Sequence, residues 1–246
     1  MRRRLRGVWL GRQRYEPVHA LQQRLHALRQ AGSIGDSVLL LEHAPVVTLG
    51  RGARPGNVLV PQFALEQAGV DLVETGRGGD VTLHAPGQLV AYPIIDLAPD
   101  RCDVRRYVGD LTEVMRRLAL ELGIVSGPAP ELIGLWVDAE RPGSFESADR
   151  ARRLAKLGAI GVRISRWVTM HGFALNLSTD LSLYDLIVPC GISAHGVTSV
   201  QALTGSAPSV REAAERALAI LGDVLDAEIA GFDDASTSPV SAELFG

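Results

Sequence analysis

Residues 70–97, VDLVETGRGGDVTLHAPGQLVAYPIIDL, contain three β-type runs in direct succession. The runs are DLVET, VTLH and QLVAYPIIDL, and glycine-containing turns separate them. Short runs rich in β-branched residues and bounded by glycine or proline are typical of strands. Strands that follow one another without an intervening helix argue against a doubly wound βαβ fold. The stretch therefore predicts an α+β domain with a mixed sheet.

On either side of this stretch, apolar residues at helical spacing alternate with further β-type runs. Amphipathic spacing predicts helices over 15–31, 104–122 and 210–225, with a short one at 61–67. Strands are expected at 37–42, 46–49, 133–137, 159–164 and 168–177. No repeat or long linker divides the chain, so we expect one domain over 1–227 and a weakly ordered tail over 228–246.

Composition excludes several function classes. A net charge of -3 over 246 residues gives no basic field for nucleic acid, so an acidic protein partner would need a local basic patch. No run approaches the roughly 20 apolar residues of a membrane span, and the apolar stretch after the N-terminal arginines is too short for a signal peptide. Cys102 and Cys190 are far apart, which fits a reducing compartment, and we expect a cytoplasmic protein.

Lys156 is the only lysine among the 25 basic residues. A compositional bias toward arginine explains why lysine is scarce, but it does not explain why Lys156 is present. Lysine can lose its proton when it is desolvated, whereas arginine effectively cannot. Lys156 is therefore either a surface cation at a strand end or a group that transfers a proton.

A glycine-rich segment, residues 75–88, brackets one short strand. Glycines there either form two tight turns or let the backbone approach a ligand closely. Arg77 is a candidate anchor for an anionic or carbonyl-bearing group, and His84 is either a structural residue or a base. The segment lacks the lysine of a phosphate-binding loop and the GxGxxG pattern. The six histidines show no short metal-ligand spacing, so no metal is expected.

Cys190 follows Pro189 and precedes Gly191, a turn that presents a sulfur rather than burying it. Buried cysteines are commonly structural. A free thiol is only a few per cent thiolate at neutral pH, and a nearby ammonium would favour the thiolate. Cys102 lies between aspartates, which disfavour a thiolate, so Cys190 is the better nucleophile candidate.

Two further strand segments carry small residues. Residues 158–161 contain two glycines, and 170–177 has Gly172 and Ala174 on one face. The small residues at 158–161 suit a strand against which another element packs closely. The missing bulk at Gly172 and Ala174 either admits a helix or leaves a slot for an alkyl chain.

Taken in order, these segments resemble the octanoyltransferases of lipoate biosynthesis over about residues 7–225. The residues that carry the resemblance are Leu10-Gly11, Tyr15, Leu21-Gln22, Leu39 to His43, Arg77 to Gly79, Thr82, His84, Pro86 to Gln88, Lys156, Ile160 to Arg163, His171 to Asn176, Val188 to Ile192 and Gly196 to Ser199.

The resemblance implies a fold similar to the catalytic domain of biotin and lipoate protein ligases. It implies that Cys190 carries an acyl thioester and that Lys156 is its partner in catalysis. By position, the substrate-binding residues would be Arg77, Gly78, Gly79, Asp80, Val81, Thr82, Leu83, His84, Ala159, Ile160, Gly161, Gly172, Phe173 and Ala174.

The same resemblance implies the partners. Octanoyl-acyl carrier protein would be the donor, and the acceptors would be lipoyl domains of 2-oxoacid dehydrogenase E2 subunits and the glycine cleavage H protein. The donor is already a thioester, so no cofactor is expected. The alternatives are an ATP-dependent lipoate or biotin protein ligase and a non-catalytic module that binds the lipoyl or carrier protein.

Two positions depart from the family pattern. Ala85 stands where a glycine is usual, and Gly158 stands where alanine is usual. Gly158 is expected to change the depth of the acyl pocket and with it the preferred chain length. Neither departure falls on Cys190 or Lys156.

Overall fold

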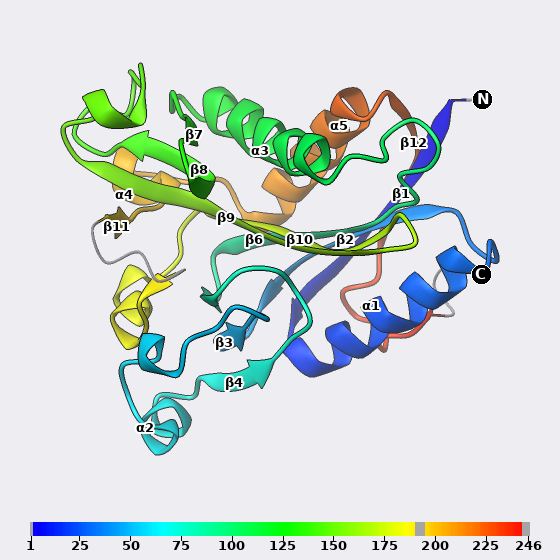
Figure 1. Ribbon diagram of the computed structural model, residues 1–246, viewed down its shortest axis with the longest axis horizontal. Helices are drawn as coiled ribbons and strands as arrows, with labels where there is room; N and C mark the ends of the chain where they lie inside the picture. The colour runs from blue at the N-terminus through cyan, green and yellow to red at the C-terminus, as the bar shows by residue number, and fades with distance from the viewer. Residues whose placement is uncertain (1, 190–194, 243–246) are drawn as a thin grey trace.

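A mixed nine-stranded sheet forms the centre of the computed structural model, which describes residues 2–189 and 195–242 (Figure 1). The strand order is β12-β1-β2-β6-β10-β9-β8-β7, with β11 paired to β9. β12, β1 and β2 run parallel to one another, and the pairs from β2 to β7 are antiparallel. The strands are β1 (Arg3–Gln13), β2 (Asp36–His43), β6 (Gln88–Ile94), β7 (Gly127–Ala129), β8 (Leu132–Asp138), β9 (Leu154–Ser165), β10 (Val168–Asn176), β11 (Gly196–Val197) and β12 (Ala227–Asp234).

Helices cover both faces of this sheet (Figure 1). α3 (Val104–Glu121) and α5 (Val210–Val224) pack together on one face, and α1 (Tyr15–Gln30) lies on the other. The side chain of Asp103 caps α3, and a capping box of Ser209 and Glu212 begins α5. Both caps satisfy backbone N–H groups that the first helical turn leaves unpaired. The remaining helices are α2 (Gln62–Gln67) and α4 (Val200–Thr204).

A small sheet lies on the same side as α1 (Figure 1). It consists of β3 (Val46–Leu49), β4 (Asp71–Glu74) and β5 (Val81–His84) in the order β4-β3-β5. Three 3₁₀ turns, Pro55–Asn57, Ala148–Arg150 and Leu181–Leu186, complete the described elements. This sheet packs its apolar face against Leu65, Tyr184 and Ile187, which brings the chain just before Pro189 next to the glycine-rich segment.

The structure confirms the predicted α+β class, the mixed sheet and the three long helices. The sequence analysis missed β1, because arginines at positions 3, 4 and 6 hide its apolar alternation. These arginines pair with carboxylates of neighbouring segments, at Asp36, Glu228 and Asp233. Such pairs permit a strand that its sequence alone does not favour. Among the described residues, none of the helices is both long and apolar enough to span a bilayer.

The prediction that weak order begins at residue 228 was wrong. Residues 227–234 form β12, which pairs in parallel with β1 from Arg3 to Trp9. Ala235 is also buried, against the apolar cluster beneath α1. The acidic composition of the segment is explained by its ion pairs with arginines, for example Arg6 with Asp233.

Candidate active site

A cavity of about 40 Å³ lies between strands β9 and β10 and the glycine-rich segment. Ten of the fourteen predicted substrate-binding residues line it: Arg77, Gly79, Thr82, His84, Ala159, Ile160, Gly161, Gly172, Phe173 and Ala174. The other lining residues are Tyr15, Tyr92 and His171. Segments more than 150 residues apart in the chain thus meet at one place.

Strand alternation explains two of the four predicted residues that do not line the cavity, Val81 and Leu83. Along β5, Thr82 and His84 face the cavity, whereas Val81 and Leu83 point into the core of the small sheet. Gly78 instead donates its N–H to Val162 O at 2.9 Å, which joins the glycine-rich segment to β9. The prediction treated residues 77–84 as a continuous lining run, whereas along β5 only every second residue faces the cavity.

Asp80 is the fourth of these residues, and its carboxylate is hydrogen-bonded to another loop. It accepts hydrogen bonds from Asn57 Nδ2 at 2.6 Å, from Arg54 N at 3.1 Å and from Val81 N at 2.8 Å. These bonds hold residues 54–57 beside the glycine-rich segment. Asp80 therefore shapes the rim of the site.

Arg77 fastens the glycine-rich segment to β3. Its buried guanidinium donates from Nε and Nη2 to Thr48 Oγ1 and from Nη2 to Thr48 O at 2.6 Å. The segment also lies directly on β9, since a Cβ at Gly161 would be 3.1 Å from Arg77 Cδ and 3.2 Å from Gly78 O. A larger residue at 161 would push the two apart and change the cavity.

Burial keeps the histidines in and beside the cavity uncharged. Burial lowers the pKa of His84 to about 4 and the pKa values of His43 and His171 to about 3. Burial also raises the pKa of Tyr15 to about 12. His84 Nδ1 lies 2.7 Å from Gln88 Oε1 and donates to it, which leaves Nε2 as the acceptor nitrogen of a neutral ring. Apart from Arg77, whose guanidinium is hydrogen-bonded to Thr48, the wall consists of neutral side chains, which suit an alkyl chain better than a charged substrate.

His171 reaches this wall through an unusual backbone. Its φ of 61° interrupts the alternation of β10, and the ring stacks on His19 of α1 with centroids 5.6 Å apart. The next residue must be small, because a Cβ at Gly172 would lie 2.1 Å from Ala91 O of β6. Sequence reasoning assigned no role to His171, and its residue type carried no signal of this conformation.

Lys156 is a buried residue of β9, with 5 % of its surface exposed. Its Nζ lies 5.2 Å from the ring centroid of Trp136, which stands opposite it on β8. Gly134 leaves room for the lysine, because a Cβ there would be 2.8 Å from Lys156 Cε and 2.5 Å from Gly158 O. The sequence analysis missed Gly134 and Trp136; the only available signal was a glycine inside a predicted strand.

The predicted nucleophile, Cys190, lies outside the described residues. The chain is described up to Pro189, which lines a second cavity of about 10 Å³ together with Lys156. This second cavity shares Thr82, Ala159 and Ala174 with the first. Along β9 and β10, the two cavities follow one another, from Lys156 toward Gly161 and His171. At about 3.3 Å per residue, Lys156 and Val162, which is paired with His171, are roughly 20 Å apart.

Comparison with known proteins agrees with this geometry. Residues 14–222 match the family model described as the lipoyl protein ligase A/B catalytic domain. An octanoyltransferase of Chloroflexus aurantiacus is 46% identical over 221 residues, which are 89% of this chain and 93% of the relative. The chain belongs to the octanoyltransferase family. A longer Myxococcus xanthus octanoyltransferase is also 46% identical over 89% of this chain, and the match spans 59% of its length.

Solved structures show how widely this octanoyltransferase-family fold is shared. A bipartite lipoate protein ligase from Thermoplasma acidophilum superposes with a TM-score of 0.68 at 15% identity, over 100% of this chain and 92% of that one. A biotin protein ligase from Aquifex aeolicus gives 0.53 at 14% identity, over 90% and 70%. These identities establish the fold alone. They confirm the expected likeness to biotin and lipoate ligases.

Proposed function

We propose that this chain transfers an octanoyl group from acyl carrier protein to a lysine of a lipoyl domain, through a thioester on Cys190. The observation that carries the proposal is the position of Lys156. The chain's sole lysine is buried beside Pro189, the residue before Cys190, and next to the cavity lined by rings and small residues.

In the first step, the Cys190 thiolate attacks the donor thioester. The tetrahedral oxyanion collapses, the bond to the pantetheine sulfur breaks, and the acyl group remains on Cys190. Lys156 begins as an ammonium held over the face of Trp136, and it gives a proton to the departing thiolate. Exchange of one thioester for another needs no ATP.

In the second step, the acceptor lysine attacks the acyl-enzyme. Lys156, now neutral, removes a proton from the incoming amine, an amide forms, and the Cys190 thiolate is regenerated beside an ammonium. Arginine at position 156 could stabilise the thiolate but could not accept this proton.

The two cavities provide a place for the acyl chain. Starting near Lys156, the chain would pass Ala159 and Ala174 and end among Gly161, Phe173 and the rings of His171 and Tyr92. Among the described residues that line this path, none carries a carboxylate. The other residues that we assign to substrate binding, Gly78, Asp80, Val81 and Leu83, would act by holding this wall in position.

The acceptors that we propose are lipoyl domains of 2-oxoacid dehydrogenase E2 subunits and the glycine cleavage H protein, with octanoyl-acyl carrier protein as donor. We place the reaction in the cytoplasm, in the first step of endogenous protein lipoylation.

Intact-mass spectrometry tests the chemistry directly. After mixing with octanoyl-acyl carrier protein, we expect an added octanoyl mass that maps to Cys190 and disappears with hydroxylamine. Cys190→Ser is the matched control and should give no hydroxylamine-sensitive adduct. An octanoyl product that forms only from free acid and ATP, with release of pyrophosphate, would instead identify a ligase.

A further inference from the structure

A groove of about 620 Å³ lies on the small sheet beside the candidate active site. Its apolar part is formed by Leu49, Val58, Val60 and Leu72. Arg51 and Arg54 line it as well, and both are exposed. The only carboxylate among its lining residues is Glu74 on β4.

The arginine side of the groove is joined to the rim of the acyl cavity. Arg51 N donates to Arg77 O at 3.0 Å, and Gly52 N donates to Gly79 O at 3.0 Å. Arg77 and Gly79 both line the acyl cavity. A Cβ at Gly50 would lie 2.3 Å from Gly79 O, so the two loops are in backbone contact.

The other side of the groove is joined to the segment that leads to Cys190. Val58 pairs with Ile187, Leu59 N donates to Leu186 O at 2.9 Å, and Val188 N donates to Asn57 O at 2.8 Å. The groove therefore lies between two loops that both touch the site, and a bound arm could pass from it to the reacting atoms.

The two arginines outnumber the carboxylate of Glu74 among the described residues of the groove. Within residues 2–189 and 195–242, no ion pair joins Arg51 or Arg54 to a carboxylate, although many other arginines have such partners. Two exposed arginines without partners in a chain of net charge -3 form a local positive site. Such a site attracts an anionic group and favours its approach.

We propose that this groove binds the phosphopantetheine arm of the acyl donor, with the phosphodiester against Arg51 and Arg54 and the branched methyl groups of the arm on the apolar residues. This inference rests on the proposed function. The charge favours the donor over the acceptor, because the acceptor's reacting group is a lysine amine, which two arginines repel, whereas the donor's arm carries a phosphate.

The test separates binding from catalysis. Octanoyl-phosphopantetheine and octanoyl-pantetheine, which differ only in the phosphate, are titrated into Cys190→Ser protein by calorimetry. We expect tighter binding of the phosphorylated ligand. Arg51→Ala/Arg54→Ala should weaken that ligand about tenfold, since each exposed ionic contact contributes up to about 1 kcal/mol, and should leave the unphosphorylated ligand unchanged. Arg51→Lys/Arg54→Lys should retain most of the preference.

Arg105→Ala is the matched control, because Arg105 is exposed, has no ion-pair partner among the described residues and lies on α3, across the central sheet. Equal binding of both ligands by the unsubstituted groove, or equal weakening of both by the double substitution, would overturn the inference. A double variant that raises the KM for the lipoyl domain alone would assign the groove to the acceptor. Acylation of Cys190 is measured separately, so a protein that binds the arm but never forms the thioester would refute only the proposed function.

Discussion

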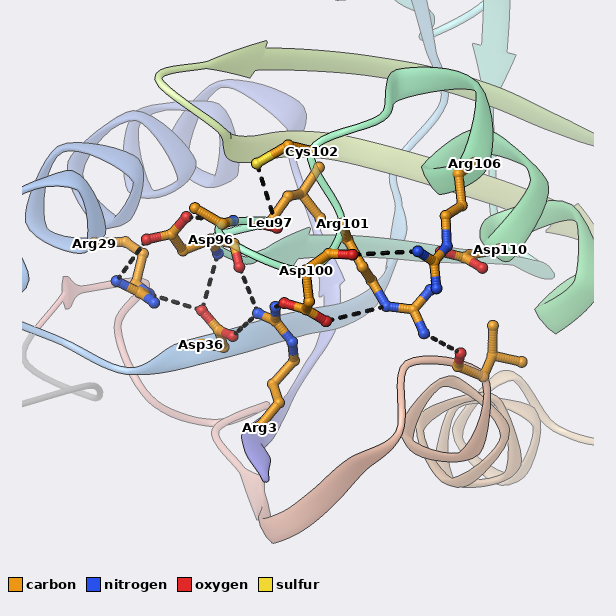
Figure 2. A network of polar contacts seen from close by, with 12 residues as sticks. Arg3, Arg29, Asp36, Asp96, Leu97, Asp100, Arg101, Cys102, Arg106 and Asp110 are labelled. Atoms are coloured by element: carbon orange, nitrogen blue, oxygen red, sulfur yellow. Dashed lines mark hydrogen bonds and ion pairs between the residues drawn. The ribbon is translucent and has the colours of Figure 1, made fainter. Parts of the chain in front are cut away.

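Buried ionisable side chains occur in two different environments in two regions of the molecule. At one end, Arg3, Arg29 and Arg101 keep their charges and are matched by Asp36, Asp96, Asp100 and Asp110 (Figure 2). In and beside the candidate active site, no ion pair among the described residues joins His43, His84 or His171 to a carboxylate, and burial lowers their pKa values instead. The first arrangement fastens segments together, and the second leaves a neutral space that a substrate can fill.

Asp36 is the centre of the charged network. It pairs with Arg3, accepts from Arg29 Nε at 2.7 Å and accepts from Asp96 N at 3.0 Å, so it joins β1, α1 and the end of β6 (Figure 2). Arg101 Nη1 donates to Asp110 at 2.6 Å, and Arg101 Nη2 donates to Val224 O at 2.9 Å, which connects α3 to α5. Each of these charges has a partner, so the network offers little to a ligand.

The largest expected effect comes from replacing Lys156 by arginine, whose charge is permanent. Lys156→Arg should retain some formation of the acyl-enzyme but slow transfer to the acceptor by roughly 10²- to 10⁴-fold, because arginine cannot act as the base. Single-turnover mass spectrometry of the acyl-enzyme and of the octanoylated acceptor measures the two steps separately. Arg163→Lys is the control, because it makes the opposite exchange between arginine and lysine at another position of β9. Full turnover by Lys156→Arg would exclude the base role.

Removing the central charge of the network should affect stability and not chemistry. Asp36→Asn leaves Arg3 and Arg29 partly buried without their shared carboxylate, and we expect a loss of about 3 kcal/mol in the free energy of unfolding. Urea denaturation measures this loss, and activity per folded molecule should stay constant. Asp233→Asn removes the exposed pair with Arg6 and should cost under about 1 kcal/mol. Equal losses of unfolding free energy in Asp36→Asn and Asp233→Asn would contradict the expectation that the buried pairs contribute more than the exposed one.

Acid should destabilise the protein through its three buried histidines, His43, His84 and His171. The folded protein binds protons at the three histidines only near pH 3 to 4, whereas the unfolded chain binds them near pH 6.5. The unfolded state therefore holds more protons between these values. Stability is fully present above pH 6.5 and falls as the pH drops toward 4, by up to about 1.4 kcal/mol per pH unit for each histidine.

Urea midpoints at pH 7, 6 and 5 test this slope. His43→Gln removes one titrating group, so the fall from pH 7 to pH 5 should be smaller than in the parent protein by about 2 kcal/mol. The comparison is made within each protein, and the variant's own loss of the bond to Tyr92 therefore cancels. A parent protein whose stability is the same at pH 7 and pH 5 would show that folding does not lower the pKa values of these histidines.

Sequence patterns predicted those features that depend on one segment at a time. The helices follow from apolar spacing, and the small residues at 172 and 174 predicted a slot at a place where the structure has a cavity. Features that depend on pairing between distant segments were missed. β12 pairs with β1 across more than 220 residues, and a shift of register between Leu135 and Trp136 places Trp136 opposite Lys156. The hydrophobic pattern of a single strand does not indicate where such a shift of register occurs.

The smallest predicted effect concerns the cation at the Pro189 end of the site, Lys156. Trp136→Leu should slow transfer about fivefold, because the ring face near Lys156 Nζ stabilises and orients the ammonium, a contribution of about 1 kcal/mol. Trp136→Phe keeps an aromatic face and should lose less, about twofold. Both variants lose the bond from Trp136 Nε1 to Leu132 O, so the difference between them reports the ring. Rates are compared at 20 °C on protein shown to be folded. If leucine and phenylalanine give the same rate, Trp136 only fills space, and Lys156 is positioned by the room that Gly134 leaves.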